Sequence, residues 1–195
     1  MTPPRQRVVI ARISLDEGRL WLVREGQAQL GRPAHATAPT LPAVTSPAIR
    51  SATFDTLSAR TFHDIVRLRV DTFIVEQDCP YPELDGRDIL PTTQHVWVED
   101  DGEVVSYLRM YPGTDGTAWI GRVVTAPSHR GRGLGGMLMR HALSVATGPV
   151  RISAQARLAP WYGSMGFERC GEDFDEDNMP HTPMVLRRSA VAAEG

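Results

Sequence analysis

The fold of this chain is decided by residues 123–135, which read Val123-Val124-Thr125-Ala126-Pro127-Ser128-His129-Arg130-Gly131-Arg132-Gly133-Leu134-Gly135. The segment begins as a strand, stops sharply at Pro127, and leads through a glycine-rich arginine loop into a helix. Such a loop presents several backbone N–H groups at the positive end of a helix dipole, where a phosphate or pyrophosphate is held. Glycines are required because a side chain would block close approach and restrict φ. A phosphorylated ligand is therefore the first hypothesis.

Three known nucleotide-binding patterns do not fit this loop. A dinucleotide fingerprint needs Gly-x-Gly-x-x-Gly, whereas residues 131–135 read Gly-x-Gly-x-Gly. A P-loop ends in lysine followed by serine or threonine, and no lysine stands there. An Arg-Gly tract for RNA is long and disordered, whereas this one enters an amphipathic helix. The remaining pattern, Arg-x-x-Gly-x-Gly from Arg130 to Gly135, resembles the acyl-CoA pyrophosphate loop of GNAT N-acetyltransferases. The alternative is a surface turn that happens to be rich in glycine.

The resemblance implies how an acyl-CoA donor would be held. The pyrophosphate would lie on Arg130, Gly131, Arg132, Gly133, Leu134, Gly135 and Gly136. In GNAT proteins the strand before the loop splays from its neighbour, and its free backbone groups pair with the amides of pantetheine. By position these residues are Val123, Val124 and Thr125, which are also expected to be buried strand residues whatever the ligand.

A second motif lies downstream, where residues 162–167 read Tyr-x-x-x-Gly-Phe. It resembles the second hallmark of GNAT enzymes, in which a tyrosine beside the CoA sulfur protonates the departing thiolate. A phenol suits that role because it stabilises the charge that develops on sulfur when the tetrahedral intermediate collapses. The alternative for Tyr162 is an aromatic packing residue on a short helix. Gln155 stands where the family usually has the asparagine that contacts the pantetheine arm.

Further segments resemble the ElaA-like branch of the GNAT proteins: residues 67–88, 120–124 and 179–184. The resemblance covers about residues 50–188. It implies an α/β fold, with a central, mostly antiparallel, splayed sheet flanked by helices. A related fold with a similar acidic segment occurs in acyl-homoserine lactone synthases.

The acceptor side is less defined by the sequence. The amine must lose a proton before attack, and the candidate bases are Glu76, Glu83, Asp85, Asp88, His95 and His181. The four acidic residues together would form an acidic lip that attracts a cationic amine, such as a polyamine, aminoglycoside or peptide N-terminus. Arg109 and Arg122 do not fit a simple site for a cationic amine. They would either favour a carboxylate on the acceptor or form ion pairs with the acidic segment. The sequence does not decide between these arrangements.

Outward from the motifs, the sequence divides into three parts. Residues 1–50 form an N-terminal extension with a possible hairpin in 7–24 and a Pro- and Ala-rich linker over 31–47. By the resemblance, residues 51–188 would form a GNAT N-acetyltransferase domain, and 189–195 a C-terminal tail. Periodicity predicts helices over 57–76, 134–146 and 158–165, and strands over 95–99, 103–111, 118–125, 150–156, 168–174 and 183–188. The helix over 134–146 is expected to bury Leu134, Leu138, Ala142 and Val145.

Composition restricts the functional classes. A formal net charge of −2 argues against a general nucleic-acid binder. No apolar run approaches the length of a membrane span, and no secretory leader is recognised. The distant Cys79 and Cys170 are expected to be reduced thiols in a cytoplasmic protein. The oligomeric state is left open, with a homodimer as one option.

No metal is expected. Residues 173–178 begin like a calcium loop, but Asn178 replaces the glycine and Met184 the final glutamate, so a solvated connection between strands is expected instead. The histidines show no ligand spacing for zinc.

The sequence thus predicts an N-acetyltransferase that moves an acetyl group from acetyl-CoA to a primary amine, on a small molecule or peptide, by direct attack. Tyr162 would be the general acid. The alternatives are a non-catalytic acyl-CoA-binding or regulatory module, and an acyltransferase with a longer acyl donor.

Overall fold

The computed structural model describes residues 46–187 of the 195-residue chain. The hairpin expected within 7–24, most of the linker expected over 31–47, and the tail 189–195 lie outside the described residues.

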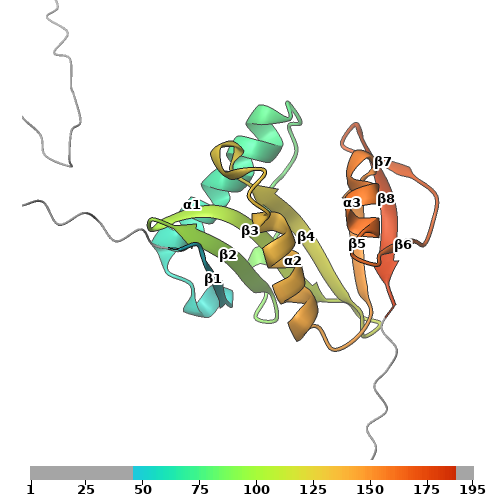
Figure 1. Ribbon diagram of the computed structural model, residues 1–195, viewed down its shortest axis with the longest axis horizontal. Helices are drawn as coiled ribbons and strands as arrows, with labels where there is room; N and C mark the ends of the chain where they lie inside the picture. Colours follow the sequence, from blue (N-terminus) through green and yellow to red (C-terminus); the bar gives the residue numbers. More distant parts are fainter. Residues whose placement is uncertain (1–45, 188–195) are drawn as a thin grey trace, which may run out of the picture. The chain divides into compact units, whose positions relative to one another are not determined.

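The described chain is built on one mixed sheet in the order β1-β2-β3-β4-β5-β8-β6, with β7 paired to β8 (Figure 1). Neighbouring strands are antiparallel except for β4 and β5, which run parallel. The α/β fold class, with a mostly antiparallel sheet flanked by helices, is therefore confirmed. The strands are β1 (Ala48–Ala52), β2 (Gln94–Asp100), β3 (Glu103–Pro112), β4 (Ala118–Thr125), β5 (Val150–Gln155), β6 (Glu168–Arg169), β7 (Phe174–Glu176) and β8 (Met179–Leu186).

The β4–β5 pair is the feature that opens the sheet. The two strands are paired only at Ala118–Val150 and Trp119–Arg151. Beyond these residues they diverge, and Figure 1 shows the wedge between them widening toward the end of β4. The predicted splay is thus present, and it leaves one side of β4 without a strand neighbour over its last residues.

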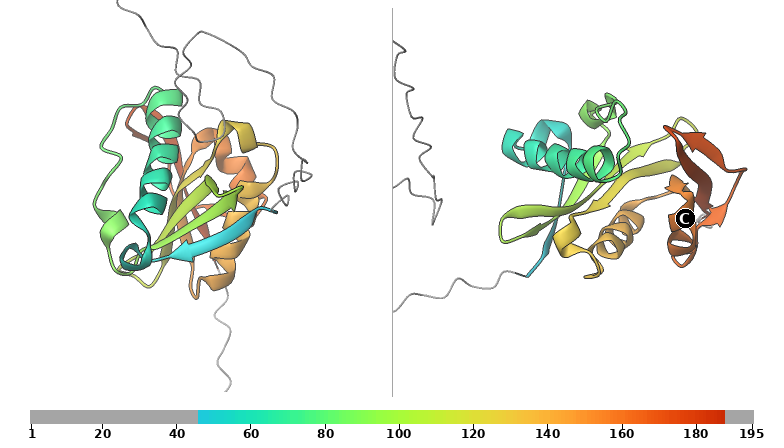
Figure 2. Two further views of the ribbon diagram at one scale, coloured as in Figure 1. Left: turned by 90° about the vertical axis from the view of Figure 1, so that its left-hand side faces the viewer. Right: turned by 90° about the horizontal axis from the view of Figure 1, so that it is seen from above.

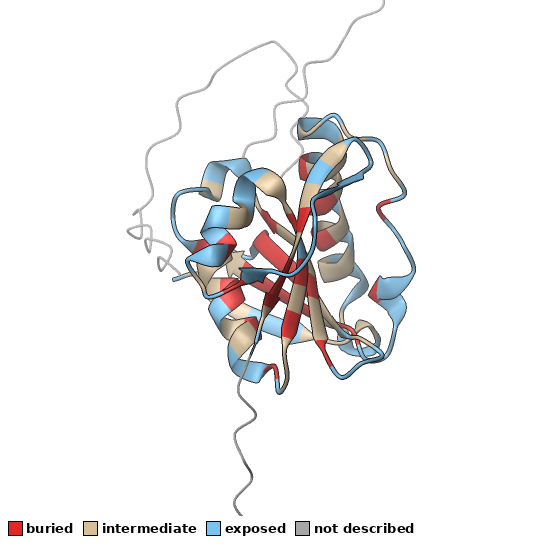
Figure 3. Cartoon of the chain, turned by 90° about the vertical axis from the view of Figure 1, so that its right-hand side faces the viewer, coloured by how far each residue is buried: buried red, intermediate tan, exposed pale blue. Residues whose placement is uncertain are grey.

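Helices cover both faces of the sheet. The α-helices are α1 (Ala59–Arg69), α2 (Leu134–Val145) and α3 (Ala159–Gly163); a π-helix, η2 (Val70–Glu76), continues α1, and short 3₁₀ turns are η1 (Phe54–Thr56), η3 (Arg87–Ile89), η4 (Pro127–His129) and η5 (Ala156–Leu158). In Figure 2, α1 lies on one face and both α2 and α3 lie on the other. Figure 3 shows the buried residues concentrated on the strands between these helices.

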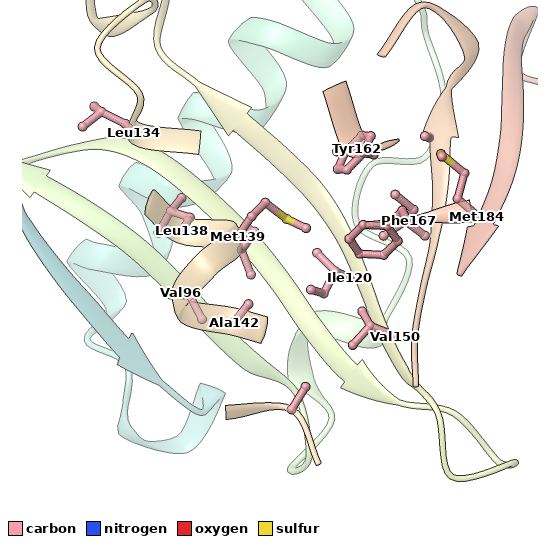
Figure 4. Close-up of a cluster of buried hydrophobic side chains, with 14 of the residues drawn as sticks. Val96, Ile120, Leu134, Leu138, Met139, Ala142, Val150, Tyr162, Phe167 and Met184 are labelled. Carbon is pink, nitrogen blue, oxygen red and sulfur yellow. The ribbon is translucent and has the colours of Figure 1, made fainter. Parts of the chain in front are cut away.

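Two hydrophobic clusters fix these layers. On the α1 face, Ile65 and Leu68 pack with Trp97, Tyr107 and Val124. On the other face, α2 and α3 contribute to a larger cluster that Figure 4 shows over the strands. Its labelled members are Val96, Ile120, Leu134, Leu138, Met139, Ala142, Val150, Tyr162, Phe167 and Met184.

One buried residue of α2 was predicted wrongly. Leu134, Leu138 and Ala142 are buried as expected, but Val145 is 52% exposed. Val145 is the last residue of the helix, where it borders an open surface hollow beside Met110 and Gly148. Met139 and Ala146 are buried in addition.

Several element bounds also differ from the prediction. The helix expected over 57–76 begins at Ala59, because Ser58 caps it by accepting a hydrogen bond from the Thr61 amide at 3.0 Å. It changes to π geometry at Val70. Strand β1 was not predicted. It pairs antiparallel with β2 from Ala48 onward, so the sheet begins three residues before the domain start predicted at residue 51.

The bounds of the C-terminal strands were also predicted incorrectly. The strand expected over 168–174 is two short strands, separated where the Cys170 amide bonds to the Pro183 carbonyl. The connection expected over 173–178 instead contains β7, which forms a hairpin with β8 through Asp177 and Asn178, both at positive φ. The last strand therefore starts at Met179, ahead of the predicted 183, and α3 is shorter than the helix predicted over 158–165.

Candidate active site

The glycine loop follows the free end of β4. Its chain turns through η4 and reaches Gly131 and Gly133, both at φ +76°. A Cβ built on either glycine would meet nothing within 4 Å. These glycines are therefore required by backbone conformation, since other L-residues rarely adopt this region, and the space beside them is open to a ligand.

The same loop ends at the N-terminus of α2. The first helical hydrogen bond joins the Met137 amide to the Gly133 carbonyl at 3.0 Å. The amides of Leu134, Gly135 and Gly136 precede that bond, so they belong to the first-turn groups that a helix leaves without partners. Together with the helix dipole they make a cradle that fits an anionic group.

The two arginines of the loop are held by carboxylates. Arg130 makes a two-pronged ion pair with Glu76, both N–O distances being 2.7 Å, and its Nε donates to the Thr125 carbonyl. Arg132 pairs with Asp100 at 2.8 Å. The hydrogen bond from Arg130 lowers the pKa of the Glu76 carboxyl. The loop is thus anchored to η2 on one side and to the β2–β3 turn on the other.

The strand residues Val123, Val124 and Thr125 lie where the wedge opens. Val124 is buried on the α1 face, and Val123 packs against the core on the α2 face. Thr125 shares a hydrogen bond with Ser106 at 2.8 Å, which ties the end of β4 to β3. Val124 and Thr125 pair with β3, and none of the three residues pairs with β5, so the edge of β4 that faces β5 has no strand neighbour here; the Thr125 carbonyl accepts a hydrogen bond from Arg130.

A β-bulge in β4 orients one of the candidate residues. The β3–β4 register shifts between Tyr107 and Arg109, so that two β4 residues lie opposite Leu108. One of them is Arg122, which has φ +55°. A bulge of this kind re-aims a side chain, and here the Arg122 guanidinium reaches Glu83 at 2.7 Å.

Tyr162 lies on α3, at the other side of the wedge. Its side chain is 6% exposed and packs edge-on against Trp161 and Phe167, with ring centroids 4.7 and 5.9 Å apart. Figure 4 shows it among the core side chains. Burial raises the pKa of its hydroxyl, so the phenol keeps its proton at neutral pH. Trp161 in turn contacts the region of Gly135, which brings α3 next to the loop.

The open end of the wedge is bridged from η2. Gln155, at the end of β5, donates to the Gln77 side chain at 2.9 Å, and the neighbouring Glu76 pairs with Arg130 after β4. His181 on β8 lies opposite Gln155 in the strand register. Its Nδ1 bonds to the Met179 carbonyl at 2.8 Å, which leaves Nε2 with the lone pair when the ring is neutral. Glu76 and His181 are the candidate bases that the structure brings to this end.

The other charged candidates form an interior arginine–carboxylate cluster on the α1 face. Arg109 contacts both oxygens of Asp85 at 2.7 Å and also Asp88 at 2.9 Å. Arg69 contacts Asp88 at 2.8 Å and the carboxylate of Glu83. With Arg122 on Glu83, three arginines meet three carboxylates.

This cluster decides between the two arrangements considered for Arg109 and Arg122, because both pair with the acidic segment. Burial by itself raises the pKa of Asp88, but the hydrogen bond and charge of Arg69 outweigh it and hold the pKa below its ordinary value. An acidic lip including Glu83 and Asp88 is not present: both carboxylates are buried, and arginines neutralise their charge. Their role is to hold residues 83–88 against the sheet.

His95 is also placed in the interior. It is fully buried; its Nε2 donates to the Asp88 carbonyl at 2.9 Å, and its Nδ1 accepts from the Tyr107 hydroxyl at 2.8 Å. Burial lowers its pKa and keeps the ring neutral. Because both ring nitrogens are already hydrogen-bonded inside the protein, His95 has no nitrogen left to take a proton from a substrate amine.

Sequence reasoning missed Arg69 as a site residue. It is completely buried at the end of α1 and joins two of the carboxylates. The signal was present, since Arg69 follows Ile65 by four residues on the apolar face of the helix. An arginine on such a face indicates a buried ion pair.

No helix within residues 46–187 is long and apolar enough to cross a membrane. Within the same residues, no group of three or more His, Cys, Asp or Glu side chains is arranged to hold a metal ion.

Comparison with known proteins supports this reading of the fold. Residues 62–167 match the family model described as the acetyltransferase (GNAT) family. A UPF0039 protein of Mycobacterium tuberculosis is 44% identical over 143 residues, which cover 71% of this chain and 92% of that protein. The crystal structure of an acyl-CoA N-acyltransferase from Pseudomonas aeruginosa is similar, with a TM-score of 0.69 and 37% identity over 72% of this chain and 99% of that one. The crystal structure of Escherichia coli ElaA also has a TM-score of 0.69, with 32% identity over 73% of this chain and 100% of that one.

Proposed function

The chain belongs to the acetyltransferase (GNAT) family, in its ElaA-like branch, and from this we propose that it transfers an acetyl group from acetyl-CoA to a primary amine. The observation that carries the proposal is the wedge between β4 and β5, which has the glycine loop at one border and the buried Tyr162 at the other. A thioester bound along the free edge of β4 would have its phosphates on the loop and its sulfur within the wedge.

In this proposal each part of the donor has a matching group. The loop from Arg130 to Gly136 holds the pyrophosphate through its backbone amides, and β4 residues 123–125 pair with the pantetheine amides. Gln155 contacts the pantetheine arm at the end of β5, where it now bonds to Gln77. The acceptor enters from the end of the wedge that Glu76 and Gln77 bridge.

The chemical step is direct attack. The amine nitrogen bonds to the thioester carbonyl carbon after losing its proton, and His181 is the candidate to receive that proton because its Nε2 is free of hydrogen bonds among residues 46–187; Glu76 would first have to leave its ion pair with Arg130. The tetrahedral intermediate collapses, the C–S bond breaks, and the Tyr162 hydroxyl gives its proton to the CoA thiolate. Its buried position suits this role, because the phenol stays protonated until the thiolate forms.

Acetyl transfer is tested with a panel of amines that includes polyamines, aminoglycosides and peptides with free N-termini. We expect free CoA thiol to be released from acetyl-CoA with at least one of them, measured by reaction with a thiol reagent. Propionyl-CoA and butyryl-CoA in parallel test for a longer donor. CoA binding without turnover on any amine would instead favour a non-catalytic module, and a protein that binds no CoA would refute both.

Gly133→Val is expected to abolish CoA binding measured by calorimetry. The valine side chain would fill the open space beside the loop, and its strained φ would shift the amides that form the cradle. Gly116→Val is the matched control, because Gly116 has φ +76° with similarly open surroundings in the turn between β3 and β4, beside the opposite end of α2 from the loop. Both variants should lose comparable stability in urea, of order 1–3 kcal/mol. Equal CoA affinity in the two variants would contradict the placement of the donor.

A further inference from the structure

A hollow of about 410 Å³ lies between α2 and the end of α3. It is lined by Gly136, Arg140, Leu143, Trp161, Ser164 and Met165. The three α2 residues are spaced at four and three positions and therefore share one face of the helix. Because Gly136 also closes the glycine loop, the hollow begins where the proposed pyrophosphate site ends.

Arg140 is the charged group of this hollow. It is exposed, and its Nη1 lies 3.4 Å from the position that a Cβ on Gly136 would take. The guanidinium is therefore folded back along α2 toward the loop. No carboxylate of residues 46–187 pairs with it, in contrast to Arg130 and Arg132, which are both engaged.

The hollow also offers an aromatic surface. Trp161 is 37% exposed, and its indole reaches the region of Gly135 at the start of α2. An indole beside an unpaired guanidinium suits a nucleotide, because a base can stack on the ring while the guanidinium binds phosphate with two donors. The Ser164 hydroxyl is committed to the Trp161 carbonyl at 2.6 Å, so Arg140 is the group left for an anion.

CoA carries one phosphate group for which the proposed loop site provides no binding partner. Its pyrophosphate joins the pantetheine arm to an adenosine whose ribose bears a separate 3′-phosphate. If pantetheine leaves the loop along β4, the adenosine leaves it on the outer side, where the hollow begins. We propose that Arg140 binds the 3′-phosphate of CoA and makes the protein prefer CoA to dephospho-CoA. This inference rests on the proposed function.

Calorimetry with CoA and dephospho-CoA tests it, since the two ligands differ only in that phosphate. The wild-type protein is expected to bind CoA about tenfold more tightly, the scale of one charge-assisted contact. Arg140→Ala should weaken CoA binding to the level of dephospho-CoA and leave dephospho-CoA binding unchanged. Arg140→Lys should keep part of the preference, because it retains the charge without the planar fork.

Arg67→Ala is the matched control, since it removes another exposed guanidinium from α1, on the opposite face of the sheet. It should leave the ratio of the two affinities unchanged. Equal affinity of the wild-type protein for both ligands, or an equal loss of both in Arg140→Ala, would overturn the role of Arg140 while leaving the donor site intact. If neither ligand binds, the proposed function fails together with this inference.

Discussion

Tyr162→Phe is expected to lower kcat for acetyl transfer by about 100-fold or more while leaving the Kd for CoA within about twofold of the wild type. The substitution removes one hydroxyl and keeps the ring that packs against Trp161 and Phe167. The thiolate would then leave without a proton from the enzyme, so the loss falls on the chemical step. Steady-state rates with the best amine of the panel, together with calorimetric CoA binding, measure the two quantities.

The control for this variant is Tyr111→Phe, which removes a phenol hydroxyl from β3 where the ring lies near Arg87 and Arg109. It should retain the wild-type kcat. The pKa of Tyr162 is raised by burial, so the wild-type rate should show no decline from ionisation of this group up to about pH 10, the ordinary value for tyrosine. A Tyr162→Phe enzyme as fast as the wild type would show that the residue only packs.

Arg69→Met is expected to lower the free energy of unfolding by about 3 kcal/mol or more. Methionine fills much of the same volume, but Glu83 and Asp88 each lose a partner inside the protein. A carboxylate left buried without compensation is costly, whereas an intact buried pair adds little. Urea unfolding at neutral pH measures the change. Arg60→Ala is the control, since its pair with Asp64 is exposed to solvent and its loss should leave the free energy of unfolding close to that of the wild type. Similar losses in both variants would contradict the role of the cluster.

The same cluster has a consequence for stability in acid. The pKa of Asp88 is lower in the folded protein than in an unfolded chain, where it is about 3.9. Its contribution is therefore fully present above about pH 4 and is lost as the pH falls through the folded pKa.

Local sequence was sufficient to predict the glycine loop and the helix that follows it. Gly131 and Gly133 are required by positive φ, Pro127 ends the strand, and the helix begins at Leu134, all features that depend on a few neighbouring residues. The wedge was anticipated from the GNAT resemblance, and the β4–β5 pairing confirms it. The roles of the loop and of Tyr162 in catalysis stay predictions.

The acceptor side could not be predicted in the same way. An acidic lip and ion pairs of the acidic segment with Arg109 and Arg122 were both considered, and Arg69, Arg109 and Arg122 come from three different elements to pair with this segment. Such pairing depends on how distant segments meet, and the sequence left both arrangements open. Val145 shows the same limit on a smaller scale, since its helical position predicted burial but the residue ends α2 at an open surface hollow.

The sequence by itself therefore determined the resemblance to the family, the order of the elements from α1 to α3 and the glycine loop, because backbone conformation and helix polarity act over short distances. Only the tertiary structure decided which charges are neutralised and which stay free. It placed Glu83, Asp88 and His95 in the interior, brought Glu76 to Arg130, and left Arg140 unpaired among residues 46–187 beside the loop. The physical reason is that the chemistry of a charged side chain depends on its burial and its partners, and both are set by residues far away in the chain.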